Sequence, residues 1–279
     1  MTSSRSTPRA IAAPEPAASN PTAASRRTLL TAGAAALALT GSGRWLHPAA
    51  AQDAATATPA DLCVLTPELT EGPYYLDDQL LRQDITAGKP GVPLKLRIGV
   101  TDIATCVPLA NAAVDVWHCD AKGYYSGIAV NRPGPDADPA IIAQAATQTF
   151  LRGIQLTDAD GFAEFATIYP GWYQGRTIHI HLKVHVGGGE QDDRYQGGHV
   201  AHTGQLFFDD AISDRVFATA KAYAGRPDEL RTRNADDGIL GNHAAEPGFI
   251  IALTPVREDS LADGFTGTIV FGVDPTATP

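Results

Sequence analysis

Apolar and polar residues alternate without a break between residues 177 and 186. The apolar positions are Ile178, Ile180, Leu182, Val184 and Val186, and the polar positions are Thr177, His179, His181, Lys183 and His185. Because successive side chains of a strand point to opposite faces of its sheet, this period of two predicts a half-buried β-strand. Its polar face is unusual, since it carries three of the eight histidines of the chain.

Several other segments have the same short, β-branched character, with glycine, proline or aspartate at their ends. They span residues 92–103, 111–119, 150–158, 161–169, 204–210, 247–256 and 264–274. An Asp-Gly turn within residues 157–165 predicts a hairpin. One helix is expected over residues 213–224, with Ser213 as a candidate N-cap. Many short strands and one short helix predict an all-β fold, an antiparallel immunoglobulin-like β-sandwich.

Four long segments show no strand pattern and are expected to be loops. They span residues 66–92, 120–148, 187–204 and 225–247. Loops of this length in a compact domain usually carry function. The sandwich is therefore expected to have long functional loops.

The N-terminal region has the features of an export signal. Arg26 and Arg27 precede an uncharged Ala/Leu/Gly run over residues 28–43, and residues 49–51 are three alanines, which fit the small-residue rule for a cleavage site. The start of this region resembles a twin-arginine signal; a disordered basic leader is the alternative. The run is too short and too weakly apolar for a membrane span. The mature protein is therefore expected in the periplasm or outside the cell, with no membrane segment.

We divide the chain into a signal peptide (1–51), a linker (52–62) and one catalytic domain (63–274). The signal peptide holds five arginines and one glutamate, which leaves 16 of the 21 basic and 30 of the 31 acidic side chains. A mature chain this acidic disfavours nucleic acid or an anionic membrane as its partner.

The domain contains three cysteines, Cys63, Cys106 and Cys119. In an oxidising compartment an odd number predicts one disulfide and one free thiol. The sequence contains no C-x-x-C pair, the spacing that is typical of a cysteine metal site. Cys106 lies in a predicted turn, and Cys119 lies at the far end of the strand that follows this turn. The length of that strand keeps the two cysteines apart. The sequence favours a bridge that involves Cys63 and leaves its partner open.

The His-x-His pair on the alternating strand is the first candidate for metal binding. His179 and His181 leave the same face about 6–7 Å apart at Cα, which allows both to bind one ion. Tyr173 follows a Pro-Gly turn six residues before His179, and Arg176 places a cation nearby. A similar turn after the strand at 111–119 carries Tyr124 and Tyr125, of which only one can face a metal if the chain is extended.

Five motifs in this order resemble the intradiol ring-cleavage dioxygenase family, most closely its exported single-domain branch related to the protocatechuate 3,4-dioxygenase beta subunit. They are TEGPYY (70–75), DVWHCDAKGYYSG (115–127), TDADGFAEFATIYPGWY (157–173), RTIHIHLKVH (176–185) and HTGQLFF (202–208). The resemblance covers residues 63–273. It implies cleavage of a catechol-type ring between its two hydroxyl-bearing carbons by O₂, which gives a cis,cis-muconate-type diacid.

The resemblance also implies a mononuclear non-haem Fe(III) site and assigns its residues. The implied ligands are Tyr125, Tyr173, His179 and His181, and the G-x-Y spacing of the family selects Tyr125 over Tyr124. Arg176 and Gln205 are implied to lie beside the iron and to contact the substrate, and Tyr125 has a catalytic role as well. Phenolate oxygen suits a hard trivalent cation, and a cation of high charge deprotonates a phenol that ordinarily titrates near 10.

Other residues near these motifs have more than one interpretation. Tyr74 and Tyr75 are expected either to line the substrate pocket or to be ordinary packing residues. His185 is expected to be exposed to solvent and His118 to be structural. His199 and His202 fall in a predicted loop that covers the iron site, with a second metal site as the alternative.

Two functions from other classes compete with the dioxygenase. A secreted β-sandwich binding module is one, because the fold often carries recognition, but it needs no pair of tyrosines beside the two histidines. A Zn²⁺ or Cu²⁺ site on the same histidine pair is the other, and it has no use for Tyr125. The chain lacks the N-terminal helical run that dimerises the catechol and hydroxyquinol enzymes, and the sequence leaves the oligomeric state open.

Overall fold

The computed structural model describes residues 63–243 and 248–279. All of them belong to one compact unit, Ala51–Pro279. The predicted signal peptide and linker lie outside the described residues. Among the residues described, no helix has the length and apolar character needed to cross a bilayer.

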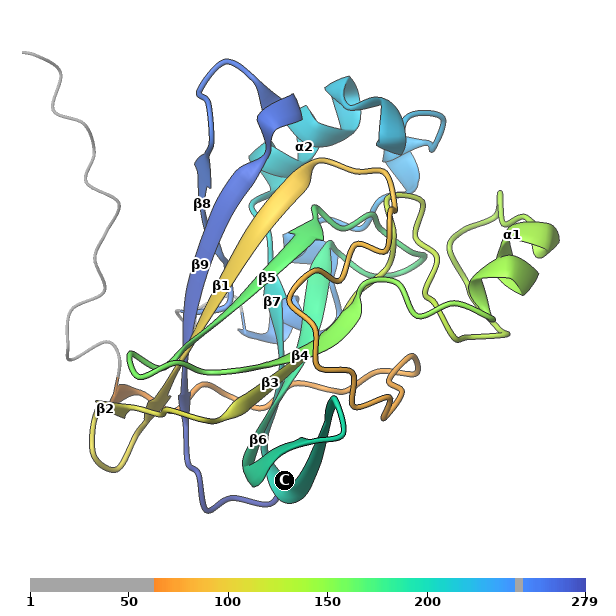
Figure 1. The fold of residues 1–279 in the computed structure, drawn as a ribbon. Coiled ribbons are helices and arrows are strands. Elements are labelled where there is room, and N and C mark those ends of the chain that lie inside the picture. The colour runs from red at the N-terminus through yellow and green to blue at the C-terminus, as the bar shows by residue number, and fades with distance from the viewer. Residues whose placement is uncertain (1–62, 244–247) are drawn as a thin grey trace, which may run out of the picture. The chain divides into compact units, whose positions relative to one another are not determined.

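Two β-sheets form the body of this unit (Figure 1). The first sheet has the order β4-β3-β6-β7, with bounds Arg152–Leu156, Ala113–Trp117, His179–Gln191 and Arg194–Phe207. The second has the order β2-β1-β9-β8, with bounds Val107–Pro108, Pro93–Asp102, Phe265–Val273 and Ala252–Pro255. A fifth strand of the second sheet, β5 (Phe162–Ile168), also pairs with β1. The predicted all-β sandwich is confirmed.

One strand pair departs from the predicted antiparallel arrangement. β1 and β9 run parallel, with Leu94 opposite Phe265 at one end of the pair and Asp102 opposite Val273 at the other. The remaining strand pairs among the described residues are antiparallel. Parallel pairing needs a long crossover, and here almost the whole domain lies between the two strands.

The apolar face of the alternating strand forms the core, as predicted. Ile180, Leu182 and Val184 are fully buried and pack in one cluster with Leu96 and Phe271 of the opposite sheet. Full burial of one such side chain stabilises the fold by about 1.5–3 kcal/mol. This packing fixes the register of β6, because a slip of one residue would move its imidazoles into the core.

The Asp-Gly turn was predicted to join a hairpin, and this prediction is wrong. The turn itself forms, since the Asp158 N–H donates to the Phe162 carbonyl and the Gly161 N–H donates to the Asp158 carbonyl. However, β4 pairs with β3 in the first sheet and β5 pairs with β1 in the second. The turn therefore carries the chain from one layer of the sandwich to the other.

The segment 187–204 is a hairpin and not the predicted loop. β6 and β7 stay paired out to Gln191 and Arg194, and Figure 1 shows the pair as a long curled ribbon. Asp192 and Asp193 turn the chain with φ of 55° and 58°, which is the left-handed backbone that a two-residue type I′ turn needs at both positions. The glycines of this segment hid the strand pattern. His199 thus lies on a strand.

Residues 63–243 and 248–279 contain two α-helices, where one was predicted. α1 (Pro139–Ala145) lies in the predicted loop 120–148 and is capped by Asp138, whose carboxylate accepts from the Ala140 N–H. α2 (Asp210–Thr219) begins earlier than predicted, and Asp209 caps it. Short 3₁₀ turns span Lys221–Tyr223, Asp228–Leu230, Asn234–Asp236, Leu240–His243 and Leu261–Asp263.

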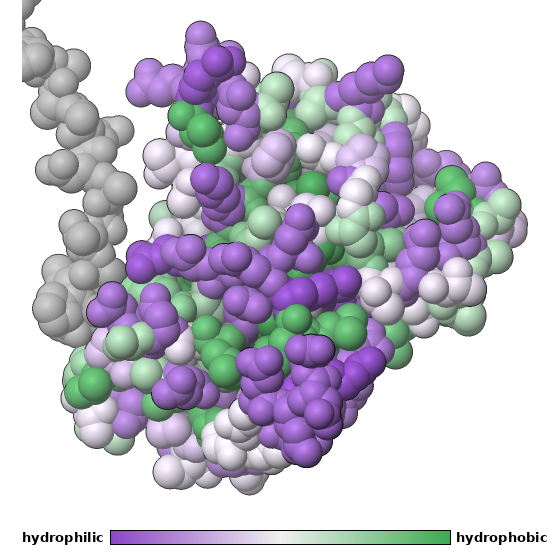
Figure 2. Space-filling view, in the orientation of Figure 1, coloured by the Kyte–Doolittle hydropathy of each residue, from purple (hydrophilic) through white to green (hydrophobic). Residues whose placement is uncertain are grey.

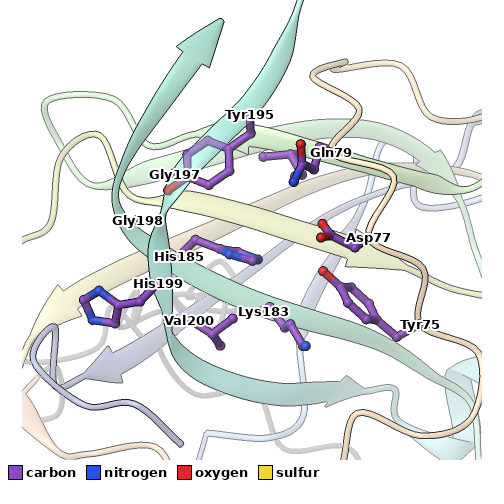
Figure 3. A pocket seen from close by; sticks show the side chains of 11 residues that line it. Tyr75, Asp77, Gln79, Lys183, His185, Tyr195, Gly197, Gly198, His199 and Val200 are labelled. Carbon is purple, nitrogen blue, oxygen red and sulfur yellow. The ribbon is translucent and has the colours of Figure 1, made fainter.

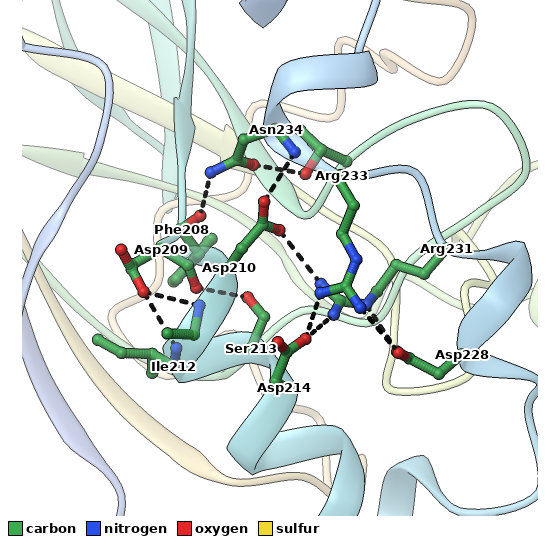
Figure 4. Close-up of polar contacts among 12 residues, drawn as sticks. Phe208, Asp209, Asp210, Ile212, Ser213, Asp214, Asp228, Arg231, Arg233 and Asn234 are labelled. Carbon is green, nitrogen blue, oxygen red and sulfur yellow. Dashed lines mark hydrogen bonds and ion pairs between the residues drawn. The ribbon is translucent and has the colours of Figure 1, made fainter.

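The start of α2 is tied to the chain that follows it. Figure 4 shows Arg231 among three carboxylates, those of Asp210, Asp214 and Asp228. The Arg231 side chain is fully buried. Asp210 also accepts from the Asn234 backbone N–H at 3.0 Å. These contacts hold the segment 228–237 against the body of the sandwich.

A disulfide joins Cys63 to Cys106, and Cys119 is a buried free thiol. The predicted bridge involving Cys63 is confirmed. The bridge attaches the first described residue to the turn between β1 and β2. Further along the chain, Thr66 is bonded to Gly272 of β9 through both its backbone and its hydroxyl.

Candidate metal centre

His179 and His181 lie on the outer face of the first sheet, near the start of β6. His181 lies opposite Trp117 of β3 and Gln205 of β7. The strand was predicted to be half-buried, but this face is covered as well, and His181 is 0% exposed. Segment 70–75 covers it, with Gly72 so close that an added Cβ would lie 3.0 Å from His181 Cε1.

The two imidazoles and Tyr173 direct their polar atoms to one point. The Nε2 atoms of His179 and His181 are 3.0 Å apart, and Tyr173 Oη is 3.3 Å from His179 Nε2. On its other side, the His179 ring donates from Nδ1 to the Thr177 carbonyl at 2.6 Å. This contact leaves the Nε2 lone pair of His179 free to bind a metal.

Tyr125 completes the group. Its ring centroid is 5.5 Å from that of Tyr173 and 6.3 Å from that of His181. Asn131 holds its backbone, accepting from the Tyr125 N–H at 2.7 Å and donating to its carbonyl at 2.9 Å. Tyr124 points elsewhere, since its hydroxyl accepts from the Asp138 N–H. The structure therefore brings together the four predicted ligands, with Tyr125 and not Tyr124 among them.

A close approach of two turns places the tyrosines side by side. Gly171, in the turn before Tyr173, lies against the turn that leads to Tyr125, and an added Cβ would lie 2.4 Å from the Asp120 carbonyl oxygen. The Gly171 N–H also donates to that oxygen. Only a glycine allows this backbone contact.

Gly171→Ala is expected to lower the free energy of unfolding by about 3 kcal/mol, the upper end of overpacking costs, because the opposing atoms are backbone and cannot rotate away. Urea denaturation measures the change. Gly189→Ala is the matched control: an added Cβ at Gly189 meets nothing within 4 Å, so a change of less than about 0.5 kcal/mol is expected there. Equal losses in both variants would contradict the steric explanation.

The four side chains fit a trivalent cation. Tyr125 Oη is buried without a hydrogen-bond partner among the described residues, an expensive state unless something binds it. The two Nε2 atoms lie 3.0 Å apart, so one ion could contact both of them. Two phenols and two imidazoles are also ligands that suit ferric iron.

Burial favours the uncharged forms of the four predicted ligands. It raises the pKa of Tyr125 well above its ordinary value and that of Tyr173 to about 12. It lowers the pKa of both His179 and His181 well below the usual range, with the charge of Arg176 adding to the effect. Without a metal the phenols are therefore protonated and the imidazoles neutral. A bound cation reverses the preference of the phenols.

Arg176 and Gln205 lie beside the four ligands and contact each other. Arg176 Nη2 donates to Gln205 Oε1 at 2.6 Å, and Gln205 Nε2 donates to the Thr70 carbonyl at 2.7 Å. Both polar ends of the Gln205 amide are thus engaged by the protein. Gln205 links Arg176 to the segment that carries Tyr74 and Tyr75.

Tyr74 and Tyr75 occupy different places. The Tyr74 ring packs against both predicted ligand tyrosines, with centroids 4.6 Å from Tyr125 and 5.6 Å from Tyr173. Tyr75 packs on Trp117. The Trp117 ring in turn stacks on the His181 ring, with 5.0 Å between the ring centroids. The Tyr75 hydroxyl donates to Asp115. Trp117 was not among the predicted site residues, although it shares the outer face of β3 with Asp115.

Tyr75 also borders a separate cavity of about 370 Å³, further along β6 (Figure 3). Its wall includes Asp77, Lys183, His185 and Tyr195. His185 was predicted to be exposed, but its side chain is only 12% exposed. Loop residues and the extended β6–β7 hairpin enclose it. Burial lowers its pKa to about 4, so the ring is neutral near pH 7.

His202 lies on the core side of β7, opposite Val184. It is fully buried, with Nδ1 2.9 Å from a Glu68 carboxylate oxygen. His199 lies among the residues that line the cavity. Among residues 63–243 and 248–279, no group of three or more His, Cys, Asp or Glu side chains could hold a metal. The described residues therefore give His199 and His202 no third ligand of these types, and the predicted loop is a strand.

His118 is structural, as predicted. It is fully buried, and its ring contacts the Cys119 carbonyl at 2.8 Å and the Thr167 hydroxyl at 2.7 Å. Burial lowers its pKa to about 4, against an ordinary value of 6.5.

This pKa shift predicts a loss of stability in acid. Between pH 6.5 and 4 the unfolded chain binds a proton at His118 that the folded protein does not, so the free energy of unfolding falls as the pH falls through this window. His118→Gln is expected to reduce that slope in the metal-free protein. Urea titrations at several pH values measure it. An unchanged slope would show that His118 titrates alike in both states.

Comparison with known proteins identifies relatives. A family profile described as Dioxygenase (Dioxygenase_C) matches residues 66–202. Catechol 1,2-dioxygenase 1 of Acinetobacter lwoffii is 34% identical over 113 residues, which are 39% of this chain and 32% of that protein. The matched part of the chain thus spans about a third of the length of this curated relative.

Two solved structures match more completely. One is an intradiol ring-cleavage dioxygenase from Tetranychus urticae, with 30% identity and a TM-score of 0.62, covering 78% of this chain and 98% of that one. The other is the dioxygenase Tetur07g02040, with 30% identity, a TM-score of 0.58 and the same coverage. The residues that the family profile matches include all four predicted ligands, Tyr125, Tyr173, His179 and His181. The chain belongs to the intradiol ring-cleavage dioxygenase family.

Proposed function

We propose that this protein is an Fe(III)-dependent dioxygenase that cleaves catechol-type rings between the two hydroxyl-bearing carbons. The products are cis,cis-muconate-type diacids. Both atoms of O₂ enter the product, so the reaction needs no external reductant. Membership of the family supports this proposal. The observation that carries it is the convergence of two phenols and two imidazoles, with one phenol oxygen buried without a partner among the described residues.

Tyr125, Tyr173, His179 and His181 would hold the ferric ion. A bound ferric ion would act as a Lewis acid that activates the chelated catechol toward O₂. Tyr125 Oη has no hydrogen-bond partner among the described residues, so it is open to the ion or to a proton. A proton released by a catechol hydroxyl would then be held at Tyr125 Oη. We therefore assign Tyr125 a catalytic role in addition to ligation.

The side chains around the four ligands would bind and orient the catechol. Arg176 supplies a fixed positive charge that would stabilise negative charge developing on the ring and its oxygens. Tyr74 would lie against the substrate, since its ring already packs on both ligand phenols. These rings also exclude water, which strengthens the electrostatic effect of Arg176.

Oxygen uptake tests the proposal directly. The purified protein is loaded separately with Fe(III), Zn²⁺ or Cu²⁺ and mixed with catechol, protocatechuate, hydroxyquinol or a chlorocatechol. We expect one O₂ consumed per substrate and a new ultraviolet absorbance of a diacid, with iron only. Charge transfer from tyrosinate to iron should also colour the loaded protein. Turnover with zinc, or iron binding without colour and without turnover on every catechol, would contradict the proposal.

We further propose that the chain is exported by its twin-arginine leader to an oxidising compartment. The Cys63–Cys106 disulfide supports this, because such bonds persist mainly outside the cytosol. Cell fractionation of the full chain, with and without the replacement of Arg26 and Arg27 by lysine, measures export. Equal export of both forms would contradict the twin-arginine route.

A further inference from the structure

A buried carboxylate lies behind Arg176. Asp237 follows the 3₁₀ turn Asn234–Asp236, and its side chain is 0% exposed. Arg176 Nε donates to Asp237 Oδ2 at 2.8 Å, and Nη2 lies 3.4 Å from Oδ1. An arginine held on two nitrogens by one carboxylate has a fixed plane as well as a fixed position.

Backbone groups hold Asp237 itself in place. Oδ2 accepts from the Thr177 N–H at 2.8 Å, and Oδ1 accepts from the N–H groups of Ile239 and Leu240 at 2.9 Å. The charge of Arg176 and these bonds outweigh burial, and they hold the pKa of Asp237 below its usual range. The carboxylate is thus rigid and ionised near neutral pH.

The contacts on the other side of Arg176 are equally defined. Nη2 donates to Gln205 Oε1, and Gln205 lies opposite His181 on the neighbouring strand. The contacts to Asp237 and Gln205 use Nε and Nη2, so neither of them occupies Nη1. The guanidinium is held between a carboxylate and an amide, with its charge directed at the metal centre.

The charge of Arg176 affects the pKa values of all four predicted ligands, so the position of the guanidinium matters. Burial raises the pKa of Tyr173 and Tyr125, and the charge of Arg176 opposes that rise at both phenols. It also disfavours protonation of His179 and His181. A guanidinium that moved away from these rings would lose this effect, since Coulomb energy falls with distance.

We propose that Asp237 is a positioning residue that fixes the guanidinium of Arg176 beside the metal centre in the orientation that the substrate requires. This inference rests on the proposed function. Asp237 lies outside the residues 66–202 that the family profile matches, in a segment whose sequence indicates only a loop.

Asp237→Asn is the first test, because it keeps the size of the side chain and removes its charge. With the iron-loaded protein and catechol, we expect kcat to fall about 10-fold or more, as for other partners that orient a site residue. KM should change less, since the charge on the substrate develops during the reaction. Iron content and the urea midpoint are measured alongside, so that kcat is expressed per folded, loaded protein.

A double-mutant cycle distinguishes positioning from general stability. In an Arg176→Lys background, which cannot form the two-nitrogen contact, Asp237→Asn should lower kcat by less than about twofold, because residues in direct contact are not additive. A purely structural role would give the same loss in both backgrounds. Equal losses, or an unchanged kcat in the single variant, would overturn the proposal.

Asp228→Asn is the matched control from the same segment. Asp228 pairs with Arg231 and Arg233 (Figure 4) and is not among the contacts of Arg176 described above. Its kcat should stay within about twofold of wild type, as for a surface substitution outside the site. A 10-fold loss here would overturn the proposal, because the segment as a whole would then control kcat.

A spectroscopic readout on metal-free protein needs no activity. The Nε–H proton of Arg176 should exchange slowly with water in the wild type and faster in Asp237→Asn, as measured by NMR. Equal exchange rates in the two proteins would show that Asp237 does not hold the Arg176 Nε–H group, and this would overturn the proposal. If the wild type consumes no O₂ with any catechol, the proposed function fails together with the positioning role. If only the variant is unaffected, the positioning role alone fails.

Discussion

His181→Ala is expected to lose iron and to lower the rate of O₂ uptake with catechol by at least about 100-fold. Replacement of a partner that only orients a ligand already costs about 10–100-fold, so loss of the ligand itself should cost more. His181 is the central donor, with its Nε2 3.0 Å from that of His179 and its ring stacked on Trp117. Iron per chain, visible absorbance and O₂ uptake measure the effect.

His185→Ala is the control for this prediction. His185 lies on the same face of β6 but borders the separate cavity, so this variant should keep its iron and its colour. Circular dichroism of both variants checks that they fold. A folded His181→Ala protein with full iron and full activity would show that the four side chains do not form the metal centre.

Removal of the Cys63–Cys106 disulfide is expected to lower the free energy of unfolding by about 4 kcal/mol. The bridge closes a loop of 43 residues, and the chain-entropy relation gives this value for a loop of that length. The cost is a large part of the 5–15 kcal/mol that stabilises a typical domain. Urea denaturation of a Cys63→Ser/Cys106→Ser protein measures it.

Reducing agent supplies the matched comparison. Wild type in reductant should become as unstable as the double variant, whereas the double variant should not respond to reductant. Cys119 is buried and free in both, so it does not distinguish them. A loss below about 1 kcal/mol would mean that the unfolded chain is already compact between these positions.

Local patterns predicted the strands well, because each reports on its own surroundings. The alternation from Ile178 to Val184 placed one face in the core, and the core residues confirm it. The turn at Asp158 and Gly161 was also found correctly. Whether the strands on either side of that turn pair with each other depends on β1 and β3, which are distant in the sequence. No local pattern contains that information.

The hairpin extension was missed for a different reason. Glycines at 187–189 and 197–198 carry no side chain to mark a face, yet the paired backbones remain bonded across them. Tyr195 supports the pair, since its hydroxyl accepts from the Gly188 N–H. The predicted exposure of His185 was wrong because an isolated strand does not show what lies over it.

The candidate site divides in the same way. The spacing of His179 and His181, together with the family resemblance that selected Tyr125 and Tyr173, named four side chains that the structure brings together. Asp237 had no signal, because it lies in a predicted loop and reaches Arg176 from 61 residues away. A residue that orients another site residue needs only a suitable side chain at the right place in the fold. Many different local sequences can supply such a side chain, so it has no recognisable motif.

The parallel pairing of β1 with β9 has a consequence for synthesis of the protein. β9 is an interior strand of its sheet, between β1 and β8, and it is synthesised long after β1. Contacts between such distant segments are slow to form. Until β9 has been synthesised, the edge of β1 that pairs with it therefore has no strand partner. A nascent chain of this protein should depend on chaperones until β9 emerges.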